Sequence, residues 1–289
     1  MGYRFRANAT TMTESVRQIA ASEFAHIRST LADKALPLDR KVHECRKSTK
    51  RLRALIRLVA PVLPEARSEI DALSDAAGRL SAMRDKGAVL ETLSGAGLPP
   101  AIAENLNNAL TRRRAASQAA LKRLLATFAA EMDAAAERAQ SWTLSREGWG
   151  ALAPGLERSY RRLRKSIDAA RRATDEDPVH RFRKRAKDHW YHTLLLRSAF
   201  PDVMDGYAAA AERLCDDLGD WRDLGLLEAA VQEVPAHLLA KPDAETALTL
   251  IAKSRRRSLR RAFRAARRLS HETPRAYTAR IEAWWKERG

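Results

Sequence analysis

Cysteine is scarce in this chain of 289 residues, which contains only Cys45 and Cys215. Two widely separated cysteines are too few for a disulfide framework, and they lack the spacing of metal ligands. We therefore expect two inert, reduced thiols in a protein of the cytoplasm, with no bound metal or other cofactor.

Long apolar runs are also missing. No uninterrupted stretch approaches the roughly 18 apolar residues of a transmembrane helix. The N-terminal residues lead into a polar stretch and lack the apolar core of a signal peptide. The sequence therefore predicts no membrane span and no export by a recognisable signal.

Acidic residues are few relative to basic ones, 36 against 53, which gives a formal net charge of +17. Hydrophobic residues nevertheless make up 45% of the chain, enough for an ordinary core, which excludes disorder driven by charge. A surface with this excess of positive charge attracts anionic polymers or anionic lipid. The composition thus predicts an anionic partner without identifying it.

Residues that favour helices dominate the rest of the sequence. Alternating runs of β-branched residues are absent, and proline and glycine lie mostly between segments of helical period. The pattern predicts an all-α protein with helices at 10–35, 40–59, 65–94, 100–139, 146–173, 178–199, 205–232, 242–270 and 274–287.

The chain also repeats itself. Three segments recur in the same order, at shifts of 137, 138 and 143: 42–50 at 179–187, 80–85 at 218–223, and 112–114 at 255–257. Ordered repeats indicate homologous units, and short helix connections favour antiparallel neighbours. We therefore predict two four-helix bundles related by internal pseudo-twofold symmetry: a first half at 1–142, a second half at 143–272, and a C-terminal helical extension at 273–289.

Both repeats place cations on one helix face. Because a helix turns 100° and rises 1.5 Å per residue, the first stripe covers about 100° of arc along about 21 Å. Its members are His43, Arg46, Lys47, Lys50 and Arg57, with Arg53 at the edge. The matching face of the second repeat carries His180, Arg183, Lys184, Lys187 and Tyr191. Stripes of this length suit an extended anion better than a single phosphate.

Two further helices carry similar stripes. The helix before His180 has Arg158, Arg161, Arg164 and Lys165, and the last helix of the second half has Lys253, Arg257, Arg260, Arg261, Arg264 and Arg268. Like charges at these spacings repel one another by a few tenths of a kcal/mol per pair. A single charged stripe is usually a solvated helix face, but its repetition favours a bound anion.

The histidines His43 and His180 admit three interpretations. Each lies in the first turn of its helix, where it can be structural. On the basic stripe it can instead contact a phosphate, which would raise its pKa. Metal ligation is the third interpretation, and it lacks partner ligands and is opposed by the neighbouring bases.

Two Arg-Asp pairs recur in the repeats, Arg84-Asp85 and Arg222-Asp223. A helix that faces the basic one would bring each acid close to a His or Lys, which the acid would hold through a charge-assisted hydrogen bond. We predict a structural role for these pairs rather than a catalytic one.

Motifs of catalysis are absent from the sequence. It contains no glycine-rich phosphate loop, no G-x-S-x-G motif, no zinc-protease motif and no E-x-E-x-K signature. We therefore expect a binding protein rather than an enzyme. A phosphohydrolase is the enzymatic alternative, which would release phosphate with magnesium or manganese.

The two histidine segments resemble the paired signatures of CHAD domains, which are named for conserved histidines in an α-helical domain. The first segment reads His43-x-x-Arg46-x-x-x-Lys50-Arg51-Leu52-Arg53. The second reads His180-x-x-Arg183-Lys184-x-x-Lys187-Asp188-His189-Trp190-Tyr191-His192, followed by Leu218-Gly219-Asp-x-Arg-Asp223-Leu224. The resemblance covers about residues 10–270 and adds Arg51 to the predicted binding residues.

This resemblance implies a basic central channel between the bundles, which binds inorganic polyphosphate without catalysis, and association with polyphosphate granules. Polyphosphate carries closely spaced charges and no bases, so its binding is sensitive to salt and gains nothing from aromatic stacking. Aromatic residues are indeed only 6% of the chain. The alternative is a nucleic-acid-binding or granule-surface interaction protein that uses the same basic faces on the outside.

Overall fold

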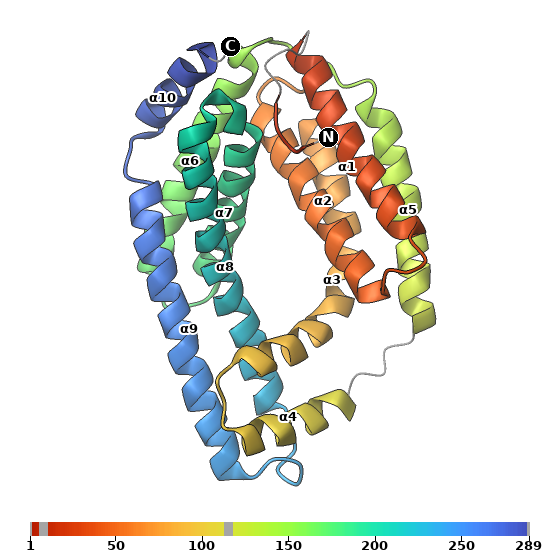
Figure 1. Ribbon diagram of the computed structural model, residues 1–289, viewed down its shortest axis with the longest axis vertical. Helices are drawn as coiled ribbons and strands as arrows, with labels where there is room; N and C mark the ends of the chain where they lie inside the picture. Colours follow the sequence, from red (N-terminus) through yellow and green to blue (C-terminus); the bar gives the residue numbers. More distant parts are fainter. Residues whose placement is uncertain (1, 6–10, 113–117, 288–289) are drawn as a thin grey trace.

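Every regular element is helical in the part of the chain that the structure describes, as the sequence predicts (Figure 1). The computed structural model describes residues 2–5, 11–112 and 118–287, without the side chains of residues 81–88, 112 and 118. In chain order the elements are α1 (Met12–Ala32), α2 (Leu38–Val59), α3 (Ala66–Gly95), α4 (Pro100–Arg112), α5 (Gln118–Ala139), α6 (Trp149–Arg171), α7 (Asp177–Leu195), the short 3₁₀ helix η1 (Arg197–Ala199), α8 (Pro201–Gln232), α9 (Lys241–Leu269) and α10 (Pro274–Glu287).

Capping residues and prolines fix several helix starts. The backbone N–H of Glu14 donates a hydrogen bond of 3.1 Å to Oγ1 of Thr11, which caps α1. Pro178, Pro201 and Pro242 lie in the first turns of α7, α8 and α9, where a missing N–H leaves no helical bond unmade.

One predicted helix differs from the structure. The segment 100–139 contains two helices, α4 and α5, which run in different directions in Figure 1. Residues 113–117 between them lie outside the described chain, as do most of the basic run at 112–114 and its side chains.

Three clusters of buried apolar side chains hold the helices together. The first is formed by α1, α2, α3 and α5, with contributions from α10 and the N-terminal part of α6. The second is formed by α6, α7, α8 and α9. The third joins the C-terminal parts of α3 and α8 to α4 and the start of α9. Helices α2 and α7 contact one another between the first two groups (Figure 1).

The predicted boundary between residues 142 and 143 falls inside the first core. Trp142 and Leu144 are both buried there, together with Trp149 and Leu156 of α6. The two halves of the sequence therefore share a core at this end of the molecule. That one repeat ends at residue 142 and the next begins at residue 143 stays a prediction from the sequence.

Close approach of α2 and α6 depends on Gly155. A Cβ atom at this position would lie 1.6 Å from the backbone oxygen of Leu58. We expect Gly155→Ala to force the two helices apart and to lower the free energy of unfolding by about 3 kcal/mol, measured by urea denaturation.

The matched control is Gly206→Ala. Gly206 is exposed in α8, and a Cβ atom there would meet nothing within 4 Å. This substitution should raise stability by about 0.5–1 kcal/mol, because alanine loses less backbone entropy than glycine in a helix. Equal effects at the two positions would contradict the proposed contact.

None of the described helices is both long enough and apolar enough to span a membrane. Helix α2, for example, is rich in charged residues along its whole length.

Candidate functional site

Four bases follow one face of α2: Arg46, Lys50, Arg53 and Arg57, all partly buried. Nη1 of Arg46 donates a hydrogen bond of 2.9 Å to the backbone oxygen of Ala77 in α3. Nε of Arg53 is buried and has no hydrogen-bond partner among the described residues. Burial, and then the charge of Arg57, lowers the pKa of Arg53 to about 10. Positive charges therefore lie close together on this face.

Helix α7 carries the corresponding row, His180, Arg183 and Lys187, also partly buried. Burial, and then the nearby charges of Arg222 and Arg183, lowers the pKa of His180. Nζ of Lys187 lies 4.4 Å from the ring centroid of Trp190. His180 is thus neutral near pH 7, and an anion bound beside it would raise its pKa.

A buried carboxylate, that of Asp188 in α7, connects the two helices. It accepts hydrogen bonds from Nη1 of Arg57 in α2 (2.9 Å) and from Nη1 of Arg185 (3.1 Å), and the residue is only 5% exposed. Arg162 of α6 lies near the same carboxylate. Its pKa is lowered mainly by loss of hydration and then by the charges of Arg158 and Arg185. One acid therefore lies among several arginines, and the cluster keeps an excess of positive charge.

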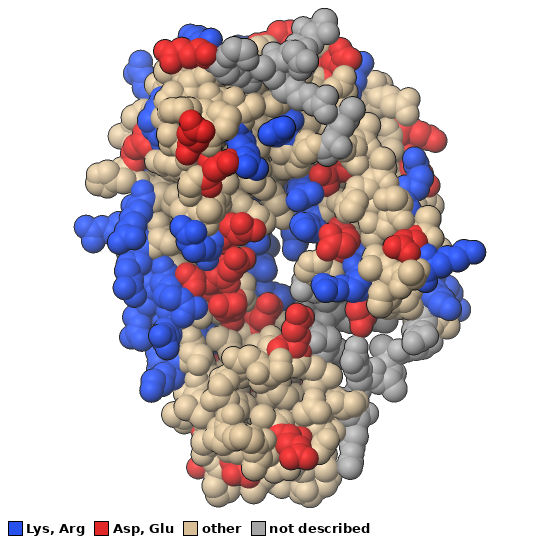
Figure 2. All heavy atoms as spheres, in the orientation of Figure 1, with Lys and Arg blue, Asp and Glu red and all other residues tan. Residues whose placement is uncertain are grey.

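An opening separates the two groups of helices in the space-filling view (Figure 2). It lies where α2 and α3 diverge from α7 and α8 in Figure 1, and basic side chains gather along its upper margin. The rows on α2 and α7 therefore belong to two helices that border the same opening.

Arg51 and Tyr191 occupy a different place, the contact between α2, α7 and the N-terminal segment. Nη1 of Arg51 lies 3.3 Å from a carboxylate oxygen of Glu23, and its guanidinium lies over the ring of Tyr3. The hydroxyl of Tyr3 donates to the backbone oxygen of Arg51 (2.7 Å). Tyr191 is 3% exposed and meets the Tyr3 ring edge-on. Both residues are thus engaged in packing the two helices together.

Of the other predicted residues in the first half, His43 and Lys47 lie near one acid. Nε2 of His43 and Nζ of Lys47 are 4.0 and 3.7 Å from carboxylate oxygens of Glu44. The side chains of Arg84 and Asp85 lie outside the described residues.

In the second half, Lys184 is exposed on α7. Nη1 of Arg222 lies 3.1 Å from a carboxylate oxygen of the adjacent Asp223. Nε2 of His180 lies 3.6 Å from a carboxylate oxygen of Glu176, one turn earlier in the chain. The structure thus provides Glu176 as the acid beside His180.

The four bases predicted on α6 have different surroundings. Arg158 lies near the Asp188 cluster, Arg161 forms an ion pair with Glu157 of its own helix, and Lys165 is exposed. Arg164 lies near Tyr160, whose burial raises its pKa to about 12 while the arginine opposes the rise.

Helix α9 turns its basic stripe outward. Arg257, Arg260 and Arg264 are exposed, and Figure 2 shows basic side chains along the outer edge where α9 runs in Figure 1. Nε of Arg261 instead lies 2.6 Å from a carboxylate oxygen of Asp217 in α8. The structure therefore places this stripe on the outer surface, apart from the opening between α2 and α7.

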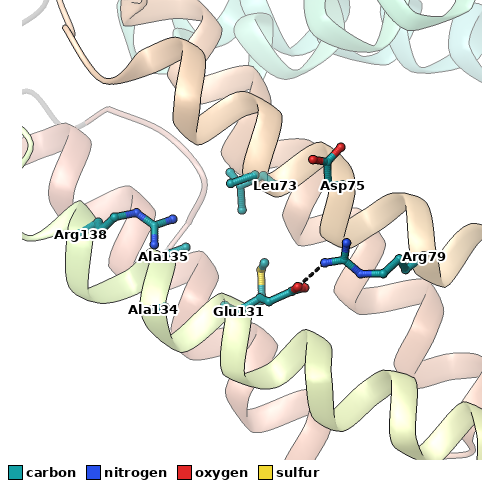
Figure 3. A pocket seen from close by; sticks show the side chains of 9 residues that line it. Leu73, Asp75, Arg79, Glu131, Ala134, Ala135 and Arg138 are labelled. Carbon is teal, nitrogen blue, oxygen red and sulfur yellow. Dashed lines mark hydrogen bonds and ion pairs between the residues drawn. The ribbon is translucent and has the colours of Figure 1, made fainter.

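A second hollow, of about 300 Å³, lies between α3 and α5 (Figure 3). Its arginines are already paired: Arg79 with Glu131, and Arg138 with the buried Glu69 through two hydrogen bonds of 2.7 and 3.0 Å. The rim is therefore electrically balanced, unlike the rows on α2 and α7.

Both thiols are buried and free, and burial raises the pKa of Cys45 and of Cys215 to about 12. They therefore remain protonated near pH 7 and are poor nucleophiles. Within the ranges that the structure describes, no three His, Cys, Asp or Glu side chains are grouped as metal ligands would be.

His189, next to Asp188, makes the protein sensitive to acid. It lies beside the stacked rings of Tyr160 and Tyr277, with both centroid distances 5.7 Å, and burial lowers its pKa to about 3. In the unfolded chain its pKa is about 6.5, so the unfolded state takes up a proton first as the pH falls. Between pH 7 and pH 5 this residue alone should lower the free energy of unfolding by about 2 kcal/mol.

The check is urea unfolding of the wild type and of His189→Phe at pH 7 and at pH 5. Phenylalanine keeps an aromatic ring beside the two stacked tyrosines and cannot be protonated. The variant should lose less stability than the wild type over this range, and equal losses would show that the acid sensitivity arises elsewhere.

Comparison with models of known protein families identifies the family of this chain. The model of the CHAD domain matches residues 18–232. The chain belongs to the CHAD domain family. The resemblance of its two histidine motifs to that family is thereby confirmed.

Solved structures agree in fold. The CHAD domain from the plant Ricinus communis superposes with a TM-score of 0.64 at 21% identity, over 94% of this chain and 96% of that one. PptA from Streptomyces chartreusis gives a TM-score of 0.59 at 16% identity, over 91% of this chain and 100% of that one. No match was found among curated proteins. At these identities the likeness establishes the helical CHAD fold.

Proposed function

We propose that this CHAD protein binds inorganic polyphosphate along the basic rows of α2 and α7 and catalyses no reaction on it. The observation that carries the proposal is that two helices with cationic rows, from opposite halves of the chain, border one opening. An anion with closely spaced charges can contact both rows at once and offset the repulsion between neighbouring arginines such as Arg53 and Arg57.

The finer arrangement belongs to the same proposal. In it, the opening is a basic central channel, and two four-helix bundles related by a pseudo-twofold axis surround it. The protein acts in the cytoplasm, where it associates with polyphosphate granules.

Aromatic side chains near the rows favour a polymer without bases. Tyr191 and Trp221 are 3% and 5% exposed, and Trp190 is partly buried beneath Lys187. Proteins that hold single-stranded nucleic acid without sequence preference stack its bases on accessible rings. The rows on α2 and α7 offer charge without such a platform.

The test is titration with long-chain polyphosphate, duplex DNA and RNA at several salt concentrations. Polyphosphate should bind most tightly, and the logarithm of its binding constant should fall linearly with the logarithm of salt concentration. Comparable affinity for all three polymers would contradict a polyphosphate-specific site. Release of phosphate in the presence of magnesium or manganese would contradict a purely binding role.

The outward stripe of α9 favours a second candidate function. Its exposed bases can meet a large polyanion, such as nucleic acid or a granule surface, that could not enter an opening between helices. The same titrations decide between the two, because this function predicts that DNA or RNA binds as tightly as polyphosphate.

A further inference from the structure

A row of bases on the outer surface of α9 takes no part in the site between α2 and α7. All its members are exposed, and they share the helix face that points away from the second core: Lys253, Arg256, Arg257, Arg260, Arg264, Arg267 and Arg268. We call this set the α9 row. From Lys253 to Arg268 it is about 22 Å long, at 1.5 Å per residue.

The acidic residues near α9 do not neutralise the α9 row, because they form ion pairs with two other arginines of the helix, Arg255 and Arg261. Nη1 of Arg255 lies 3.1 Å from Glu228 of α8, and Arg255 also pairs with Glu176. Arg261 pairs with Asp217, at 2.6 Å. In the described part of the chain no ion pair joins a member of the α9 row to an acid.

Acidic side chains separate the α9 row from the opening. Figure 2 shows them over α8, between the basic outer edge and the opening. Exposed acids of α8 include Glu212, Asp216 and Asp220. A polyanion that crossed this surface from the α9 row to the opening would pass over like charge, so the two basic regions are separate on this face.

From this separation we propose that the α9 row is a second polyphosphate site, and that one protein molecule bridges two polyphosphate segments. The inference rests on the proposed function, since it assigns the same ligand to both regions. Two sites on one rigid body convert a binding protein into a cross-linker of long chains.

The side chains of α9 favour polyphosphate over single-stranded nucleic acid in this second site. Its one aromatic residue, Phe263, stacks on Phe182 of α7, so the row has no ring on which bases can stack. The opposite side of α9 is packed on α8 along the second core, which keeps the row on the exposed side of the helix. A flexible chain of phosphates can follow a straight, exposed row.

The test compares the wild type with R257E/R260E/R264E and with K50E/K187E, which reverses charge between α2 and α7. The variant K34E/K122E/R123E, with the same three reversals at exposed positions elsewhere, is the control. With a short polyphosphate, calorimetry should give two chains per wild-type or control molecule and one per molecule of either site variant. With long-chain polyphosphate, light scattering should rise for the wild type and control and stay low for both site variants.

Each outcome separates this inference from the proposed function. If the wild type binds only one polyphosphate chain, only the second site is refuted. The same conclusion follows if the α9 variant binds as many chains as the wild type while K50E/K187E binds fewer. If the wild type binds no polyphosphate, the proposed function fails as well. If the α9 variant loses RNA or DNA binding and keeps all polyphosphate binding, the row is a nucleic-acid site. R257Q/R260Q/R264Q, checked by circular dichroism, replaces the triple reversal if that variant does not fold.

Discussion

Reversing charge at Lys50 and Lys187 together should weaken polyphosphate binding at the site between α2 and α7 by roughly 100-fold or more. Each lysine belongs to one of the two rows, and Nζ of Lys187 lies 4.4 Å from the ring centroid of Trp190. A hydrogen bond to a charged group contributes about 1.5–3 kcal/mol, and tenfold in affinity corresponds to about 1.4 kcal/mol. Lys50→Glu with Lys187→Glu removes two such contacts and adds repulsion.

A charge-matched control distinguishes the site from the net charge. Lys34→Glu with Lys122→Glu makes the same change at two exposed positions away from α2 and α7. This control should lose only a few-fold in affinity, through the weaker overall field. Both proteins should keep their helical circular dichroism, and similar losses of affinity would place the site elsewhere.

Much of the fold could be predicted from the helical period and from proline. The start of α7 at Asp177, before Pro178, follows from the sequence, because proline suits a first helical turn. The shared face of Arg46, Lys50 and Arg53 follows from the turn of 100° per residue. These features are local, so neighbours in sequence determine them.

Features that depend on distant partners were not predicted. Arg51 belongs to the same basic run as Arg53, but Glu23 and Tyr3, far away in sequence, hold it in the α2–α7 contact. In the sequence Asp188 is only one member of the second histidine motif, although in the structure it contacts Arg57 of the first half and Arg185 of the second. Periodicity places a side chain on a face, and only tertiary contact shows what that face meets.

Runs of basic residues show the same limit of prediction from sequence. Arg255 and Arg257 stand two positions apart, yet Arg255 lies over the ring of Trp221 and pairs with acids, whereas Arg257 is exposed. On α6, Arg162 lies about 40° around the helix from Arg158 and close to Asp188, a position that the spacing of the basic residues does not distinguish from those of Arg161 and Arg164. A count of cations cannot separate those that stabilise the fold from those open to a ligand.

Replacing Asp188 by asparagine should lower the free energy of unfolding by roughly 3 kcal/mol in the absence of a polyanion. The carboxylate accepts hydrogen bonds from Arg57 (2.9 Å) and Arg185 (3.1 Å). Its negative charge also favours the charged forms of the nearby Arg53 and Arg162. Removing one partner of a buried pair leaves the other charge uncompensated, which typically costs 3–5 kcal/mol, and partial exposure of the arginines reduces this.

Added polyphosphate separates the electrostatic role of Asp188 from a packing role. Without the acid the arginine cluster carries more positive charge, so polyphosphate should raise the melting temperature of Asp188→Asn by more than it raises that of the wild type. The control is Asp133→Asn, which breaks the exposed pair with Arg28 (2.8 Å) and should cost less than about 1 kcal/mol with no added response to polyphosphate. An equal rise for Asp188→Asn and the wild type would mean that the cluster does not face the bound polyanion, whereas a larger rise places the cluster within the field of the bound chain.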